Sequence, residues 1–185
     1  MGFAPIVTNI EHLGFHGEDI AAIILTHCHF DHVGGAARFK AEFGTRLIMH
    51  ALDADIVERR DQRLTAAFCF DVVFEPLPID QKLYGKEEVI RFGEFVIHCL
   101  HTPGHSAGSI SPYLEINGAR VLFAQDISAP PLLEFSCDPL AWRRSLDKLI
   151  ALEADILCDG HTGVYRPKSR VKAYFQRILR TAESG

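Results

Sequence analysis

The chain has 185 residues, 48% of them hydrophobic and 23% charged, which is an ordinary globular composition. The formal net charge of -5 argues against a nucleic acid or an anionic membrane as a partner. No apolar run approaches the roughly 20 residues of a membrane-spanning helix, and residues 1–5 lack the pattern of a secretory signal. Five cysteines without zinc-ribbon spacing are expected to be reduced, mostly buried thiols. We therefore expect one cytoplasmic domain over residues 1–185, with a homodimer as the default assembly.

The hydrophobic pattern predicts a mixture of helices and strands. In the first half, helices are expected over residues 6–13, 36–43 and 51–68, and strands over residues 21–26 and 46–50. In the second half, two hairpins are expected, with strands over 89–92 and 95–100 and over 110–116 and 120–124. A helix over 140–152, a strand over 155–158 and a helix over 168–180 follow. This mixture indicates an α/β layered domain.

The stretch His27–His32, which reads His-Cys-His-Phe-Asp-His, is the most informative part of the chain. Residues two apart on a strand share a face, so His27 and His29 are expected to project together from the end of the preceding apolar strand. Asp31 and His32 are expected in the turn that follows. Three imidazoles and a carboxylate this close together are typical of metal ligands.

Followed by Gly34-Gly35, this stretch resembles the first signature of the metallo-β-lactamase superfamily. Three later segments resemble the other signatures of that family in the same order: Thr102–Ser109, Val121–Asp126 and Ile156–His161. The family more often has glycine where Gln125 stands. Without the resemblance, His105 and His161 would be read as turn residues and Asp126 as a strand-end cap.

The resemblance implies the four-layer αββα sandwich of that family, in which two sheets pack face to face with helices outside. The family normally opens with several antiparallel strands before its first helix, whereas the first apolar strand here is expected at about Ala21. We therefore expect an N-terminally truncated form of the fold. Either the chain is a fragment of a longer product, or a partner supplies the missing strands.

The resemblance also implies two metal positions. The first metal would be held by His27, His29 and His105, the second by Asp31, His32 and His161, and Asp126 would bridge them. These nitrogen and oxygen donors suit two Zn²⁺ ions per chain, and also Fe or Mn. Asp31 and Asp126 are assigned as the catalytic residues. Two metals about 3.5–4 Å apart would share a water, lower its pKa toward ~7 and yield a bridging hydroxide that attacks an acyl carbon.

We therefore expect a metal-dependent hydrolase of a small ester, thioester or lactone. A β-lactamase would need a secretory signal, a nuclease would carry more positive charge, and hydroxyacylglutathione hydrolases use a further helical domain for which the chain ends too soon. Two alternatives stay open. One is a persulfide dioxygenase with a single iron held by His27, His105 and Asp126, and the other is a truncated metal-binding domain without turnover.

Several further residues have weaker signals. Cys28 is expected to point away from the neighbouring ligands as a buried thiol. His50 and His98 are interpreted as structural, and His101 as either a partner of a ligand or a surface imidazole. Four apolar residues could wall a substrate pocket or pack in the core: Leu132, Leu133, Phe135 and Trp142.

Overall fold

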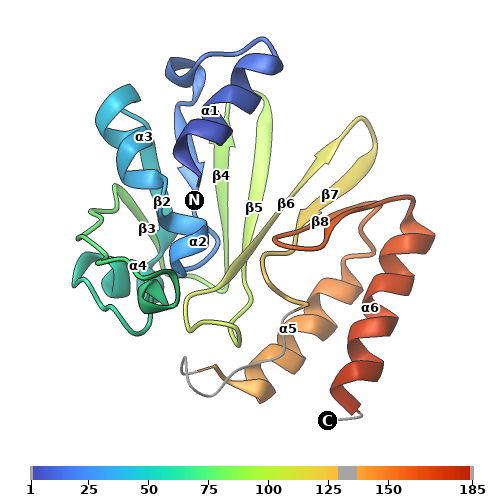
Figure 1. Ribbon diagram of the computed structural model, residues 1–185. Helices are drawn as coiled ribbons and strands as arrows, with labels where there is room; N and C mark the ends of the chain where they lie inside the picture. Colours follow the sequence, from blue (N-terminus) through green and yellow to red (C-terminus); the bar gives the residue numbers. More distant parts are fainter. Residues whose placement is uncertain (1, 129–136, 184–185) are drawn as a thin grey trace. The chain divides into compact units, whose positions relative to one another are not determined.

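The computed structural model describes residues 2–128 and 137–183 (Figure 1). These residues form a mixed α/β structure with two β-sheets, and the chain divides into two compact units, Met1–Tyr84 and Gly85–Gly185. Within the described ranges, no helix has both the length and the apolar character needed to cross a bilayer.

The first unit contains a three-stranded parallel sheet in the order β1-β2-β3. Its helices are α1 (Phe3–His12), α2 (Phe30–Val33), α3 (Ala36–Phe43) and α4 (Ala51–Glu58), and its strands are β1 (Ala22–Ile24), β2 (Arg46–His50) and β3 (Gln81–Leu83). Short 3₁₀ turns lie at Gly17–Asp19 and Ala67–Phe70. The central strand β2 is buried from its second residue onward, as expected for a parallel strand covered on both faces.

Helix boundaries in this unit follow local backbone chemistry. The predicted helix over 36–43 is confirmed, and Gly44 ends it in the left-handed conformation at φ 69°. The predicted helix over 51–68 is wrong, because α4 ends at Glu58. Arg60 adopts φ 62°, and the Asp61 carboxylate accepts backbone N–H bonds from Arg63 and Leu64 at 3.2 and 2.9 Å. This side chain offers the backbone an alternative to helical bonds.

The second unit contains a six-stranded sheet in the order β4-β5-β6-β7-β8-β9. Its strands are β4 (Glu87–Phe92), β5 (Phe95–His101), β6 (Ile110–Ile116), β7 (Ala119–Phe123), β8 (Ile156–Asp159) and β9 (Gly163–Tyr165), and its helices are α5 (Pro139–Ala151) and α6 (Lys168–Glu183). Neighbouring strands are antiparallel except for β7 and β8, which are parallel. Both predicted hairpins are confirmed. Asn117 and Gly118 adopt φ 50° and 76°, as a two-residue type I′ turn requires.

The core of the second unit lies where α5 and α6 pack together and against the sheet. Trp142 of α5 is buried there, and its indole N–H donates to the Ile127 carbonyl at 3.1 Å. This contact favours the packing interpretation of Trp142 over the pocket interpretation. The other proposed wall residues, Leu132, Leu133 and Phe135, lie outside the described residues.

Candidate metal centre

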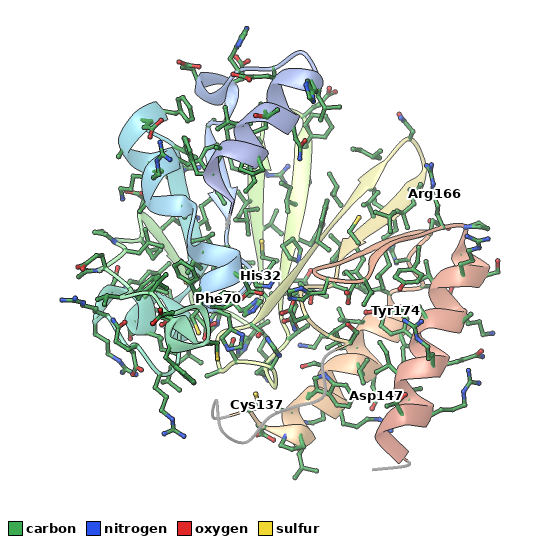
Figure 2. The ribbon with its side chains drawn as sticks, viewed as in Figure 1. His32, Phe70, Cys137, Asp147, Arg166 and Tyr174 are labelled. Atoms are coloured by element: carbon green, nitrogen blue, oxygen red, sulfur yellow. The ribbon has the colours of Figure 1, made fainter. Side chains whose placement is uncertain are left out.

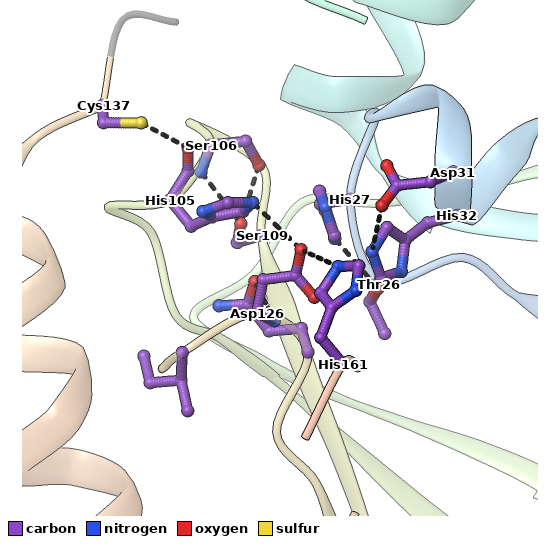
Figure 3. Close-up of polar contacts among 12 residues, drawn as sticks. Thr26, His27, Asp31, His32, His105, Ser106, Ser109, Asp126, Cys137 and His161 are labelled. Carbon is purple, nitrogen blue, oxygen red and sulfur yellow. Dashed lines mark hydrogen bonds and ion pairs between the residues drawn. The ribbon is translucent and has the colours of Figure 1, made fainter. Parts of the chain in front are cut away.

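Four of the predicted ligands lie on the loop and short helix that follow β1. The His27 ring centroid is 4.8 Å from that of His29 and 4.1 Å from that of His32. Asp31 Oδ2 is 3.5 Å from His32 Nε2 (Figure 3). We call His27, His29, Asp31 and His32 the first half-site. Sequence alone predicted this grouping.

The reason for the grouping differs from the one that the sequence suggested. Sheet pairing of β1 ends at Ile24, and Leu25 makes a last bond, donating to the Ile48 carbonyl at 2.8 Å. His27 and His29 therefore lie beyond the strand, in the loop, so strand alternation does not place them. His29 is the extended residue before α2, at φ -68° and ψ 143°, and the last two ligands lie on that helix rather than in a turn.

Hydrogen bonds donated by backbone N–H groups hold this loop in place. The Cys28 N–H donates to the carboxylate of Asp53 at 2.8 Å, and the Phe30 N–H donates to the Thr65 carbonyl at 2.7 Å. Cys28 is buried as predicted, and its thiol donates to the Leu64 carbonyl at 3.4 Å. Burial, together with the Asp53 carboxylate, raises the pKa of Cys28 well above its usual value. Sequence reasoning missed Asp53, whose signal was a carboxylate in the first turn of a buried helix.

The other three predicted ligands lie together in the second unit. Asp126 Oδ2 is 3.4 Å from His105 Nε2 and 3.0 Å from His161 Nε2, so one carboxylate oxygen serves both imidazoles (Figure 3). His105 and Asp126 are buried, whereas 53% of the His161 side chain is exposed. We call His105, Asp126 and His161 the second half-site.

Gln125 sets the direction of Asp126. Its φ of 47° is left-handed, which accounts for the family's preference for glycine at this position. The Gln125 side-chain carbonyl accepts the Asp126 N–H at 3.0 Å, and its backbone carbonyl accepts the Gly160 N–H at 2.9 Å. The ends of β7 and β8 are thereby tied together next to the carboxylate.

The His105 turn is built from small residues. Gly104, at φ 137°, donates its N–H to the Ser106 carbonyl at 3.0 Å, and Ser106 N–H donates to Ser109 Oγ at 3.1 Å. The Cys137 thiol donates to the His105 carbonyl at 2.9 Å. These bonds hold the histidine backbone while its ring faces Asp126.

Asp159 organises the turn that carries His161. Its Oδ1 accepts the N–H of His161 at 3.0 Å and the N–H and hydroxyl of Thr162 at 2.7 and 2.8 Å, and its Oδ2 accepts the hydroxyl of Tyr174. Figure 2 shows Tyr174 on α6. Burial acts to raise the pKa of Asp159, but the bonds from Tyr174, Thr162 and His161 outweigh it and lower that pKa. Sequence reasoning missed both Asp159 and Tyr174.

Two further histidines have structural roles. His50 precedes α4, and its Nδ1 accepts the Leu52 N–H at 3.4 Å. His98 lies 2.9 Å from the Glu87 carboxylate and stacks on Tyr113 at 4.7 Å between ring centroids.

The sequence left His101 open as either a partner of a ligand or a surface imidazole, and the structure places it against the turn that carries His105. Its Nε2 lies 2.8 Å from the Ala107 carbonyl, two residues from His105, so it contacts the ligand-bearing turn.

The donor chemistry of each half-site fits a divalent metal. The donors are imidazole nitrogens and carboxylate oxygens, which suit zinc, iron or manganese. The potential ligand atoms of His27 and His29 lie within 4.8 Å of each other, as do those of Asp31 and His32. Zinc–donor bonds are about 2.0–2.2 Å long, so two donors that share one ion lie at most about 4.4 Å apart, and the 4.8 Å limit is close to that span.

Tyr174→Phe is expected to weaken metal binding at the second half-site. Loss of the hydroxyl removes one of the bonds that hold the Asp159 carboxylate under the His161 turn. Outer-shell partners of this kind typically contribute about 10–100-fold in metal affinity, and we expect the lower end, about 10-fold. Zinc titration with a competing chelator measures the change. Tyr113→Phe, whose hydroxyl contacts Glu87 at 3.5 Å, is the matched control. Equal affinities in both variants would contradict the role of Tyr174.

Comparison with known proteins identifies the family. The sequence profile described as the Metallo-beta-lactamase superfamily matches residues 2–161. The chain belongs to this superfamily. A hydroxyacylglutathione hydrolase of Bradyrhizobium sp. (strain ORS 278) is 30% identical over 166 residues, which cover 85% of this chain and 53% of the relative. The chain therefore spans about half the length of the curated relatives it matches.

Solved structures of the superfamily have the same fold. A metallo-β-lactamase from Cronobacter sakazakii aligns with a TM-score of 0.79 at 25% identity, over 98% of this chain and 81% of its own. A class B3 di-zinc metallo-β-lactamase from an Alaskan soil metagenome aligns with a TM-score of 0.74 at 24% identity, over 98% and 77%. The predicted mixed α/β metallo-β-lactamase fold with two sheets is thereby confirmed. The joint assignment of the seven ligands stays a prediction.

Proposed function

We propose that the chain is a metal-dependent hydrolase of a thioester, ester or lactone in which the two half-sites jointly hold two zinc ions. The observation that carries this proposal is the position of Asp126. One oxygen of this buried carboxylate lies within 3.4 Å of two imidazole nitrogens from different segments, as a carboxylate shared by two ions requires.

In this proposal, two of the seven ligands also act on the reacting water. Bound zinc ions would lower the pKa of a bound water toward ~7 and polarise the substrate carbonyl. Asp126 would orient the nucleophilic water from its buried position. Asp31, 17% of whose side chain is exposed, can take the proton of that water and pass it to the leaving group. No serine or cysteine nucleophile is then needed.

Thioesters are the first substrates to test. The curated relative at 30% identity is named a hydroxyacylglutathione hydrolase. Its name supports thioester chemistry for the matched region, which is about half of that relative. A cytoplasmic location, a homodimer, a small-molecule substrate and the absence of nucleic-acid and membrane partners stay part of the proposal.

Elemental analysis of the purified chain, run beside a panel of thioesters, lactones and phosphodiesters, tests the proposal. We expect two zinc ions per chain and thioester or lactone hydrolysis that chelation abolishes and added zinc restores. One iron ion with oxygen uptake on a persulfide would replace the proposal with the dioxygenase. Bound metal without turnover on any member of the panel would leave a non-catalytic metal-binding domain.

A further inference from the structure

A cavity of about 210 Å³ lies within the first unit, between α1, β1 and the α2–α3 segment. Among the described residues that line it, only Asp31 and His32 carry polar side chains. Both belong to the first half-site. The lining of the cavity therefore combines two proposed metal ligands with apolar residues.

The apolar wall comes from three elements. Ile6 and Ile10 lie four residues apart on α1 and share one face of that helix. Ile23 comes from β1, and Phe39, which is 2% exposed, comes from α3. A wall of branched aliphatic and aromatic groups favours an apolar occupant through burial of its surface.

We propose that this cavity binds the apolar acyl group of the substrate, an inference that rests on the proposed hydrolase function. The reacting carbonyl would lie beside Asp31 and His32, and the acyl chain would extend toward Ile10 and Phe39. An engineered apolar cavity of about 150 Å³ accommodates benzene, so the volume here suits a phenyl or an aliphatic group of about six carbons.

A series of acyl thioesters with two to twelve carbons tests the assignment. Each CH₂ that enters the cavity contributes about 0.8 kcal/mol, or about fourfold in kcat/KM. We expect kcat/KM to rise from acetyl to about hexanoyl and then level off. A flat profile across the series would overturn the inference while leaving the hydrolase in place.

A variant that fills the cavity with a larger side chain tests whether the cavity binds the acyl group or serves only the packing of the fold. Ile6 is 46% exposed, so Ile6→Trp can place an indole at the cavity without disturbing the core. This variant is expected to lower hexanoyl turnover at least about tenfold more than acetyl turnover, since the longer acyl group loses more contacts. Thr8→Trp, at an exposed position on the same helix, is the matched control. Equal losses for all chain lengths would contradict the inference.

Binding without turnover keeps the test independent of the proposed function. Hexanamide is the probe, and the ¹³C signals of the isoleucine δ1 methyl groups are the readout. We expect shifts confined to the cavity isoleucines, and their loss in Ile6→Trp. Shifts without hydrolysis would retain the cavity and reject the hydrolase, and no shifts at millimolar hexanamide would reject the cavity.

Discussion

Asp126→Asn is expected to abolish hydrolysis and to lower zinc occupancy. Asparagine has nearly the shape of aspartate, so the backbone bond from residue 126 to the Gln125 side chain can persist. The neutral amide, however, supplies no charge at the point where His105 and His161 meet. Loss of an outer-shell partner alone costs about 10–100-fold, so loss of a shared ligand should cost at least about 10³-fold in kcat/KM. Steady-state kinetics and elemental analysis on the same samples check this expectation.

The control for this variant is Asp147→Asn. Asp147 lies exposed on α5, where it pairs with Arg143 at 3.4 Å, and Figure 2 labels it. An exposed pair one helical turn apart contributes little to stability, so activity and zinc content should match the wild type. Full turnover by Asp126→Asn, or by an Asp126→Ala, His161→Ala double variant, would refute the two-metal assignment.

Local chemistry made much of the secondary structure predictable. Gly44 and the pair Asn117-Gly118 favour the backbone conformations that they adopt, and the apolar runs around them have strand or helix periodicity. The elements that were missed, α2, β3 and β9, have three or four residues each. Segments this short are too brief to show a hydrophobic period.

The proposed ligands could be selected from the sequence because their residue types are rare in such a spacing, whereas the residues that hold them in place could not. Asp53, Asp159 and Tyr174 act through bonds that join segments 15–25 residues apart in the sequence. Nothing in the sequence marks such partners before the fold brings them together. Asp159 had a partial signal, since an aspartate often bonds the backbone N–H two residues on. Gln125 departs from the family pattern in sequence but not in backbone conformation. It adopts the left-handed conformation that the more common glycine would adopt.

Gly104→Ala is expected to have the largest effect on stability. A Cβ at this position would lie 2.3 Å from the Trp142 Cα and 2.4 Å from its backbone nitrogen, far inside contact distance. Trp142 cannot withdraw, because it is buried and its N–H donates to the Asp138 carbonyl at 2.8 Å. The Asp138 N–H in turn donates to the Gly104 carbonyl at 2.9 Å. Overpacking of about 1–3 kcal/mol and left-handed strain of about 1–2 kcal/mol together predict a loss of about 2–5 kcal/mol in the free energy of unfolding.

Gly163→Ala separates the two contributions. Gly163 adopts φ 107°, also outside the range that alanine prefers, but a Cβ built there meets nothing else in the described chain within 4 Å. Its cost should therefore be backbone strain alone, about 1–2 kcal/mol. Urea unfolding of the two variants measures the difference. Equal losses of stability would mean that α5 shifts to accommodate the methyl group, and the rigid contact between the His105 turn and α5 would then be wrong.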